Sequence, residues 1–293
     1  MILGLALAAL AADGIDRRTL VEWIGACQED QAAACLSLGL VYAQGSPPIV
    51  PVNLTEAERW LERACGAGMS EGCLGLGAVR ETLAGAGDGA SFEGARDAYG
   101  QACEANNLLA CAAEAALYER GVVAGEPQPL RERACAGAHG PSCVALGMAL
   151  EGARDPEGAL AAYHRGCEAG APDACAALGA MQFLGPRALR DPEAGRANLA
   201  LACEAGLGET CALLGARAES EDAALDWWRQ GCEREDAWSC WKGAQLLRRD
   251  SEEESAELLE AACGHGLDKA CRKLERAFPA VDEVDAPEAA ASD

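Results

Sequence analysis

One pattern of hydrophobic and small residues recurs eight times along the chain, always in the same register relative to a pair of cysteines. A large residue lies four positions before the first cysteine of each pair, and a small residue directly precedes that cysteine. Positions four apart share one face of an α-helix, so each segment predicts an amphipathic helix that ends near the first cysteine. The large positions are Trp23, Leu61, Tyr99, Arg131, Tyr163, Leu199, Trp228 and Leu259, with Arg131 the one polar exception.

A second helical register follows each pair of cysteines. The residue three positions after the second cysteine is Leu in six of the eight repeats, with Glu114 and Gly243 as departures, and the next position is Gly or Ala in seven. Gly weakens a helix by about 1 kcal/mol relative to Ala. Its recurrence in one register therefore indicates that a neighbouring helix crosses closely there. These small positions run from Gly39 to Ala244.

Capping residues and spacing define the repeat. Asp155 and Asp191 each precede a proline at an expected helix start, and Ser220 and Ser251 precede acidic first turns. The first cysteines of successive pairs lie 38, 38, 32, 32, 36, 29 and 31 residues apart. We therefore expect an all-α solenoid of about eight helix-turn-helix repeats stacked side by side, in which each repeat contacts mainly its neighbours.

The 16 cysteines allow either a disulfide framework or metal sites. Seven residues separate the members of every pair, no CxxC motif occurs, and the chain has only 3 His, so we expect no metal and no cofactor. Eight residues of unbroken helix span about 12 Å, whereas a disulfide needs Cα atoms within about 7 Å. If the pairs are bonded, the chain reverses between their members. The pairs are Cys27 with Cys35, Cys65 with Cys73, Cys103 with Cys111, Cys135 with Cys143, Cys167 with Cys175, Cys203 with Cys211, Cys232 with Cys240, and Cys263 with Cys271.

Composition and charge narrow the possible partners. Half of the residues are hydrophobic but only 4% are aromatic, which suits closely approaching helices. No stretch approaches the roughly 20 apolar residues of a membrane span. The formal net charge is −23, the opposite of what a phosphate-binding protein needs. We therefore expect neither nucleic acid nor an anionic membrane surface as a partner.

The segments ACEAGLGETCALLG (202–215) and GCEAGAPDACAALG (166–179) resemble Sel-one-like repeats, and the paired cysteines resemble the Hcp-type, cysteine-rich branch of that family. The resemblance covers about residues 16–278. It implies a right-handed α/α superhelical solenoid related to tetratricopeptide arrays, with one disulfide per helix-turn-helix repeat and a periplasmic or secreted location. Members act as adaptors or peptide-binding scaffolds, and some cysteine-rich members are named β-lactamases.

The two ends of the chain follow different patterns. Residues 1–15 begin with an apolar run that ends in small residues but lacks the Lys or Arg of a signal peptide's first region. This segment fits either a signal peptide or the second helix of a truncated leading repeat. Residues 279–293 are acidic and rich in Ala and Pro, so we expect a disordered tail.

Two short motifs match catalytic signatures without the partners that catalysis requires. Ser239 and Lys242 form the S-x-x-K pattern of serine β-lactamases, but no S-D-N or K-T-G accompanies it. Ser70 lies in a G-x-S-x-G segment that occupies an inter-helix turn with no strand before it. We expect no catalytic residue. A weak penicillin-binding or β-lactam-hydrolysing protein is the alternative function, which rests on the family resemblance.

Two groups of side chains are candidates for binding. Trp238 and Trp241 flank Cys240, where they either anchor a partner or fill the core. Polar donors also recur two residues before the first cysteine. If that helix face lines the concave groove, they form a row for peptide carbonyls or carboxylates; the alternative is a solvated face that pairs with the abundant Glu. The row consists of Arg63, Gln101, Arg133, Arg165 and Gln230.

The sequence thus predicts a non-catalytic scaffold, a monomeric array that binds a protein or peptide on its concave face. The paired cysteines favour a periplasmic or secreted location. A cytosolic repeat protein with reduced thiols is the alternative.

Overall fold

The computed structural model describes residues 15–87, 91–248 and 251–277. These residues form sixteen α-helices and a short 3₁₀ helix, η2 (Arg187–Leu189). The only β-type pairing among them is an isolated bridge between Ser46 and Val50. The predicted all-α class is confirmed. The segments expected to be a signal peptide or leading helix and an acidic tail lie outside the described residues, apart from residue 15.

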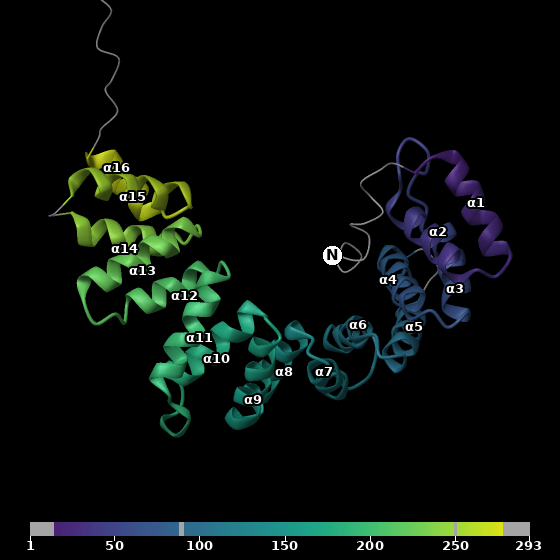
Figure 1. Cartoon of the computed structure of the whole chain (residues 1–293), viewed down its shortest axis with the longest axis horizontal. Helices are drawn as coiled ribbons and strands as arrows, with labels where there is room; N and C mark the ends of the chain where they lie inside the picture. The colour runs from purple at the N-terminus through teal and green to yellow at the C-terminus, as the bar shows by residue number, and fades with distance from the viewer. Residues whose placement is uncertain (1–14, 88–90, 249–250, 278–293) are drawn as a thin grey trace, which may run out of the picture. The chain divides into compact units, whose positions relative to one another are not determined.

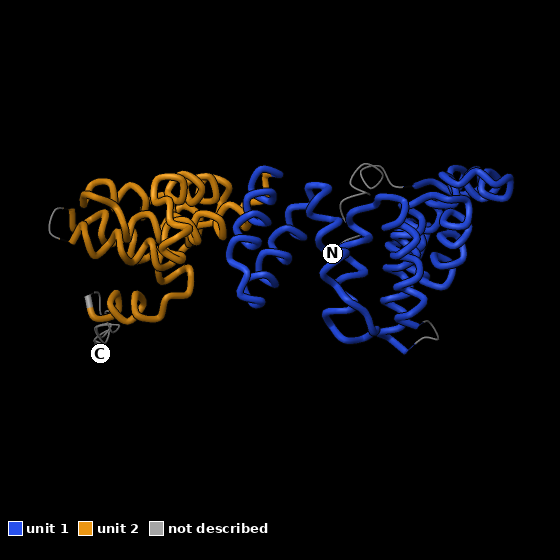
Figure 2. Tube along the Cα trace, turned by 90° about the horizontal axis from the view of Figure 1, so that it is seen from below, with its two compact units in different colours: residues 1–169 blue, residues 170–293 orange. Residues whose placement is uncertain are grey.

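Helix contacts divide the chain into two compact units, residues 1–169 and 170–293, which Figure 2 shows in different colours. Unit 1 contains α1 (Arg17–Gln28), α2 (Ala32–Gln44), α3 (Leu54–Gly66), α4 (Ser70–Ala86), α5 (Phe92–Glu104), α6 (Leu108–Glu119), α7 (Pro127–Ala136), α8 (Gly140–Gly152) and α9 (Pro156–Glu168). Unit 2 contains α10 (Pro172–Leu184), α11 (Pro192–Glu204), α12 (Gly208–Gly215), α13 (Glu221–Glu233), α14 (Ala237–Leu247), α15 (Glu252–Gly264) and α16 (Asp268–Ala277). Within each unit, helices that follow one another in sequence pack side by side (Figure 1).

Disulfides join the two helices of each repeat. In the first repeat, Cys27 of α1 and Cys35 of α2 are bonded, with their Cα atoms 4.8 Å apart. Cys167 and Cys175 are disulfide-bonded as well, and no described cysteine is free. The predicted stapling of the helical repeats is confirmed. Six further bridges, with Cα–Cα distances from 4.5 to 5.1 Å, join Cys65 to Cys73, Cys103 to Cys111, Cys135 to Cys143, Cys203 to Cys211, Cys232 to Cys240, and Cys263 to Cys271.

Every turn between the paired helices contains one residue with positive φ, three positions after the first cysteine. The values run from 61° at Asp30 to 108° at Gly206. A left-handed residue ends an α-helix and lets the next amide donate back to an unpaired carbonyl; the Gln31 amide accordingly donates to the Ala26 carbonyl oxygen at 3.0 Å. Glycine occupies four of the eight positions, and the others are Asp30, Asn106, Ala138 and Glu235.

Consecutive repeats pack through the small residue of one and the large residue of the next. A Cβ added to Gly39 of α2 would collide with the side chain of Leu61 in α3, so only glycine allows this approach without a shift. The predicted close crossing of helices at this register is confirmed. The same relation joins Gly77 to Tyr99, Gly147 to Tyr163, Gly179 to Leu199 and Gly215 to Trp228.

Two of these junctions carry an additional polar clamp. The Tyr99 hydroxyl of α5 donates to Glu81 of α4 at 2.8 Å, and the Tyr163 hydroxyl of α9 donates to Glu151 of α8 at 2.9 Å. Burial raises the pKa of both tyrosines, and the adjacent carboxylates raise it further, so both hydroxyls keep their protons over the physiological range. Each clamp ties one repeat of unit 1 to the next.

At the junction between the third and fourth repeats, a charged residue replaces the large apolar or aromatic residue found at the others. Arg131 occupies the large position of α7 and forms an ion pair with Glu119 at the end of α6. Glu114 occupies the usual Leu position of α6 and accepts a hydrogen bond from the Tyr118 hydroxyl at 2.8 Å. Arg131 therefore makes its contact across the junction, whereas the contact of Glu114 lies within the third repeat.

Candidate binding surface

The polar side chains two residues before the first cysteine project from the last turn of the first helix in their repeats. Arg63, Gln101, Arg133 and Arg165 belong to unit 1 and are exposed, whereas Gln230 belongs to unit 2 and is half-buried. Four of the five predicted row members therefore recur on successive repeats of one unit. Whether a partner binds along them stays a prediction.

Arg63 and Arg133 both reach back to the turn of the preceding repeat. Arg63 Nη2 lies 3.0 Å from Asp30 Oδ1, and Arg133 Nη2 donates to Asn106 Oδ1 at 3.1 Å. Arg133 Nη2 also donates to the Glu104 carbonyl at 3.3 Å. Asp30 and Asn106 are the positive-φ residues of their turns, so the same turn position accepts the arginine in both repeats.

Gln101 and Arg165 follow turns whose positive-φ position carries no side-chain acceptor, because that residue is Gly68 or Ala138. Gln101 Oε1 lies 3.4 Å from Cys65 Sγ, a contact without a hydrogen bond because a disulfide sulfur carries no proton. The guanidinium of Arg165 has no ion pair with another described residue. Both side chains keep their hydrogen-bonding groups for solvent or a ligand.

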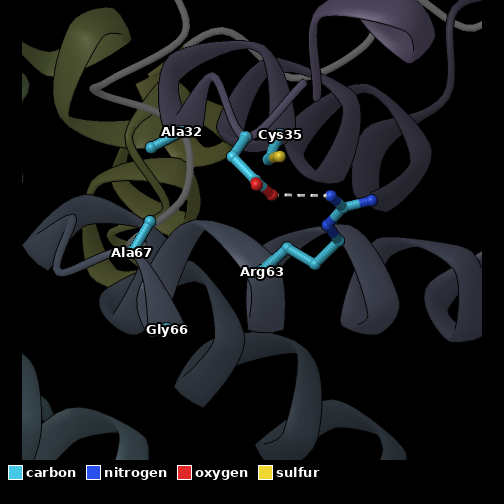
Figure 3. A pocket seen from close by; sticks show the side chains of 6 residues that line it. Ala32, Cys35, Arg63, Gly66 and Ala67 are labelled. Atoms are coloured by element: carbon cyan, nitrogen blue, oxygen red, sulfur yellow. Dashed lines mark hydrogen bonds and ion pairs between the residues drawn. The ribbon is translucent and has the colours of Figure 1, made fainter. Parts of the chain in front are cut away.

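A surface hollow of about 310 Å³ lies at the junction of the first two repeats. The Arg63 guanidinium extends across it to the Asp30 carboxylate, the ion pair drawn dashed in Figure 3. The side chain of Arg63 is 38% exposed, so it presents further N–H donors to solvent. The lining residues are Asp30, Ala32 and Cys35 of the first repeat and Arg63, Gly66 and Ala67 of the second.

A more open hollow of about 440 Å³ lies on the third repeat and includes Gln101. Glu114 lines it beside Gly100, and a Cβ added to Gly100 would make ordinary van der Waals contact with the Glu114 carboxylate at 3.6 Å. Burial, followed by the hydrogen bond to Glu114, raises the pKa of Tyr118 to about 12. The lining residues are Arg96, Asp97, Gly100, Gln101, Glu104, Glu114 and Tyr118. The sequence marked Glu114 as a departure but gave no sign that it lines a hollow.

Trp238 and Trp241 lie on α14 in unit 2 and have different surroundings. Trp238 is 44% exposed, whereas Trp241 is half-buried and packs against the core of the last repeats. Lysine side chains lie over both rings, with Lys269 Nζ 3.6 Å from the Trp238 ring centroid and 4.8 Å from that of Trp241. Trp241 therefore fills the core in part, and Trp238 presents ring surface to solvent.

The two serines of the catalytic-type motifs have structural roles. Ser239 is fully buried, its hydroxyl has no hydrogen-bond partner, and its backbone amide donates to Asp236 at the start of α14 at 2.7 Å. Lys242 lies over the Trp238 ring, 5.3 Å from its centroid. Ser70 is the first residue of α4, and its hydroxyl donates to Glu71 at 3.1 Å. Because Ser239 is fully buried, it is not placed as an accessible nucleophile.

In the described ranges, no group of three or more His, Cys, Asp or Glu side chains is arranged to hold a metal ion. None of the described helices combines the length and the apolar character that crossing a membrane requires. The paired cysteines fit an oxidising, extracytoplasmic environment.

These features define an all-α solenoid whose helix-turn-helix repeats each carry a disulfide. No protein-family model and no curated protein matches the chain. Among solved structures, it is similar to a Sel1 repeat protein from Oxalobacter formigenes, with 20% identity, a TM-score of 0.69 and coverage of 88% of this chain and 80% of that one. A protective antigen of uropathogenic Escherichia coli with the SLR fold is 20% identical, with a TM-score of 0.47 over 88% of this chain and 67% of that one. The chain has the Sel1-repeat fold, as its repeat sequences predicted.

Proposed function

We propose that the chain is a non-catalytic scaffold that binds an extended segment of a protein partner along the first-helix side chains of unit 1, on the concave face expected for such arrays. One observation supports this most directly: two hollows of unit 1 are each lined by the polar residue two positions before the first cysteine, Arg63 in one and Gln101 in the other. An extended segment exposes both backbone donors and acceptors, and the hollows offer both kinds of group.

The ion pair between Arg63 and Asp30 supports binding rather than competing with it. A guanidinium has five N–H donors in a fixed fork, and the pair with Asp30 involves one of its nitrogen atoms. The pair also limits the rotamers of Arg63, so less side-chain entropy is lost when a ligand carbonyl or carboxylate binds. Arg133 is held in the same way by Asn106.

The location we propose is periplasmic or secreted. Disulfides persist in oxidising compartments and are rare in the cytosol. The disulfide-bonded cysteines in every repeat support that placement. We propose that the array acts as a monomer there.

Partner capture tests this function. The immobilised, oxidised protein should enrich a protein from periplasmic extract, and the double variant Arg63→Ala with Arg133→Ala should reduce that enrichment about ten-fold, because it removes two charge-assisted donors. The double variant Arg17→Ala with Arg18→Ala is the matched control, since both residues are exposed on α1 and carry the same charge. No enrichment by the native protein, or equal loss in both double variants, would contradict the proposal.

A further inference from the structure

All three lysines of the chain lie at one place in unit 2. Lys242 belongs to α14, and Lys269 and Lys273 belong to α16. The chain has 47 acidic residues and 24 Lys and Arg, so a local excess of positive charge is a departure from its overall character.

Two tryptophans hold these lysines in place. Lys269 Nζ lies over both rings, 3.6 Å from the centroid of Trp238 and 4.8 Å from that of Trp241. Lys242 Nζ lies 5.3 Å from the Trp238 centroid, and Lys273 Nζ lies 5.2 Å from the Trp241 centroid. Each contact falls within the roughly 6 Å over which an indole face attracts an ammonium group. The indoles therefore position the three charges without neutralising them.

Two arginines of α16 extend the positive charge. Residues 269, 272, 273 and 276 follow the i, i+3, i+4, i+7 spacing that places side chains on one helix face. Arg272 and Arg276 are both exposed and share this face with Lys269 and Lys273. Asp268 lies four residues before Arg272 and Glu275 three residues after it, so both carboxylates adjoin the Arg272 side of this face and lie further from Lys273.

No carboxylate of the described residues forms an ion pair with these five cations. Elsewhere the chain pairs its cations readily; Arg80, for example, contacts both Glu58 and Glu62. We refer to Trp238, Trp241, Lys242, Lys269, Arg272, Lys273 and Arg276 as the Lys–Trp surface. It combines unpaired positive charge with an exposed indole, since Trp238 is 44% exposed.

We infer that the Lys–Trp surface binds an acidic segment of a partner protein, a short stretch of Asp or Glu that also carries an apolar side chain for Trp238. This inference rests on the proposed scaffold function and specifies the chemistry of a partner. The ammonium groups supply charge-assisted donors to carboxylates, and the exposed indole supplies apolar area.

Charge favours a short acidic segment over a long polyanion. The remainder of the chain is strongly acidic, and repulsion between exposed charges extends about 8 Å at physiological ionic strength. A nucleic acid longer than the surface would therefore meet unfavourable charge around it, whereas a short segment would not. Repulsion by the acidic remainder of the chain also favours binding of an acidic segment at the Lys–Trp surface, where a group of described cations forms no ion pairs.

Fluorescence anisotropy with a labelled acidic peptide tests the inference. The peptide has about twelve residues, in which Glu alternates with Ala and Leu. It is kept short because exposed charge pairs interact over a short range. The full-length protein should bind this peptide, fail to bind the same peptide with every Glu replaced by Gln, and lose affinity as salt rises. The double variant Lys269→Gln with Lys273→Gln should weaken binding about ten-fold or more, because both positions contribute charge-assisted contacts. Arg17→Gln with Arg18→Gln makes the same change in net charge on α1 and should stay within about two-fold of the native affinity.

Trp238→Ala supplies a second readout. It should weaken binding while leaving all lysines in the chain, and the change in tryptophan emission on peptide addition should shrink with it. Circular dichroism and cooperative unfolding confirm that each variant is folded.

Three results would overturn the inference. The first is no salt-sensitive binding of the acidic peptide by the native protein. The second is a heparin oligosaccharide that binds the same surface more tightly than the peptide. The third is a carbodiimide cross-link from Lys269 or Lys273 to carboxylates of residues 279–293 in the protein alone, which would identify the chain's own acidic tail as the occupant. Partner capture that survives the double lysine variant but not the double variant of Arg63 and Arg133 would remove this inference and keep the proposed function.

Discussion

At the scale of single residues, the turn of each repeat depends on one left-handed position. Gly occupies this position in four repeats, for example at Gly68, whereas Asp30 and Glu235 carry side chains and adopt the same conformation. An αL residue with a side chain costs roughly 1–2 kcal/mol. The disulfide and the packing of both helices offset this cost, so the local sequence of these turns does not by itself predict the left-handed residue.

Ala138→Gly tests this role at an exposed position with φ of 65°. Alanine pays the steric cost of the left-handed region without gaining a side-chain hydrogen bond, so glycine should raise the free energy of unfolding by about 1 kcal/mol, measured by chemical denaturation. Gly68→Ala makes the reverse change at the equivalent position, where φ is 84°, and should destabilise by a similar amount. A loss of stability in Ala138→Gly would contradict this account of the turn.

The row and the Lys–Trp surface also show what a residue pattern can and cannot predict. The recurrence of Arg and Gln two residues before the first cysteine is visible in sequence. The contacts of Arg63 and Arg133 with the preceding turn are not visible in sequence, because their partners Asp30 and Asn106 lie 33 and 27 residues earlier. Lys269 lies 31 residues after Trp238, so its contact with the ring likewise depends on how α16 packs against α14.

At the scale of helices, five of the seven junctions between repeats follow one rule, in which a glycine on the second helix of one repeat contacts the large side chain of the next. The sequence predicted the close crossing because Gly recurs where a helix former is expected. It did not predict the ion pair at the junction of the third and fourth repeats, where Arg131 replaces the large apolar residue and contacts Glu119. Nor did it predict that Glu114 would accept a hydrogen bond from Tyr118 of its own helix, because a repeat pattern does not specify side-chain directions.

Gly77→Ala tests the junction rule within a single helix. A Cβ at this position would collide with the Tyr99 ring, so we expect a loss of about 1–3 kcal/mol in the free energy of unfolding. Gly85→Ala in the same helix is the control, because no heavy atom lies within 4 Å of its added Cβ and alanine favours helix. Equal effects of the two substitutions on urea denaturation would show that helix propensity, not packing, explains the recurring spacing of small residues.

At the scale of the whole molecule, the repeat count, the helix order and the disulfide stapling followed from the cysteine spacing. A solenoid unit contacts mainly its neighbours, so local sequence determines most of its structure. The division into residues 1–169 and 170–293 did not follow, since the cysteine register continues without change across residue 169. Such a division depends on the density of contacts between helices, which spacing alone does not reveal.

The stapled architecture depends on each disulfide joining two cysteines of the same repeat. Proteolysis without reduction, followed by mass spectrometry of the linked peptides, measures this directly on protein isolated under non-reducing conditions. We predict that all 16 cysteines appear in links between residues eight apart, from Cys27 with Cys35 to Cys263 with Cys271. Free thiols at these positions, or links between different repeats, would contradict both the stapled architecture and the oxidising location.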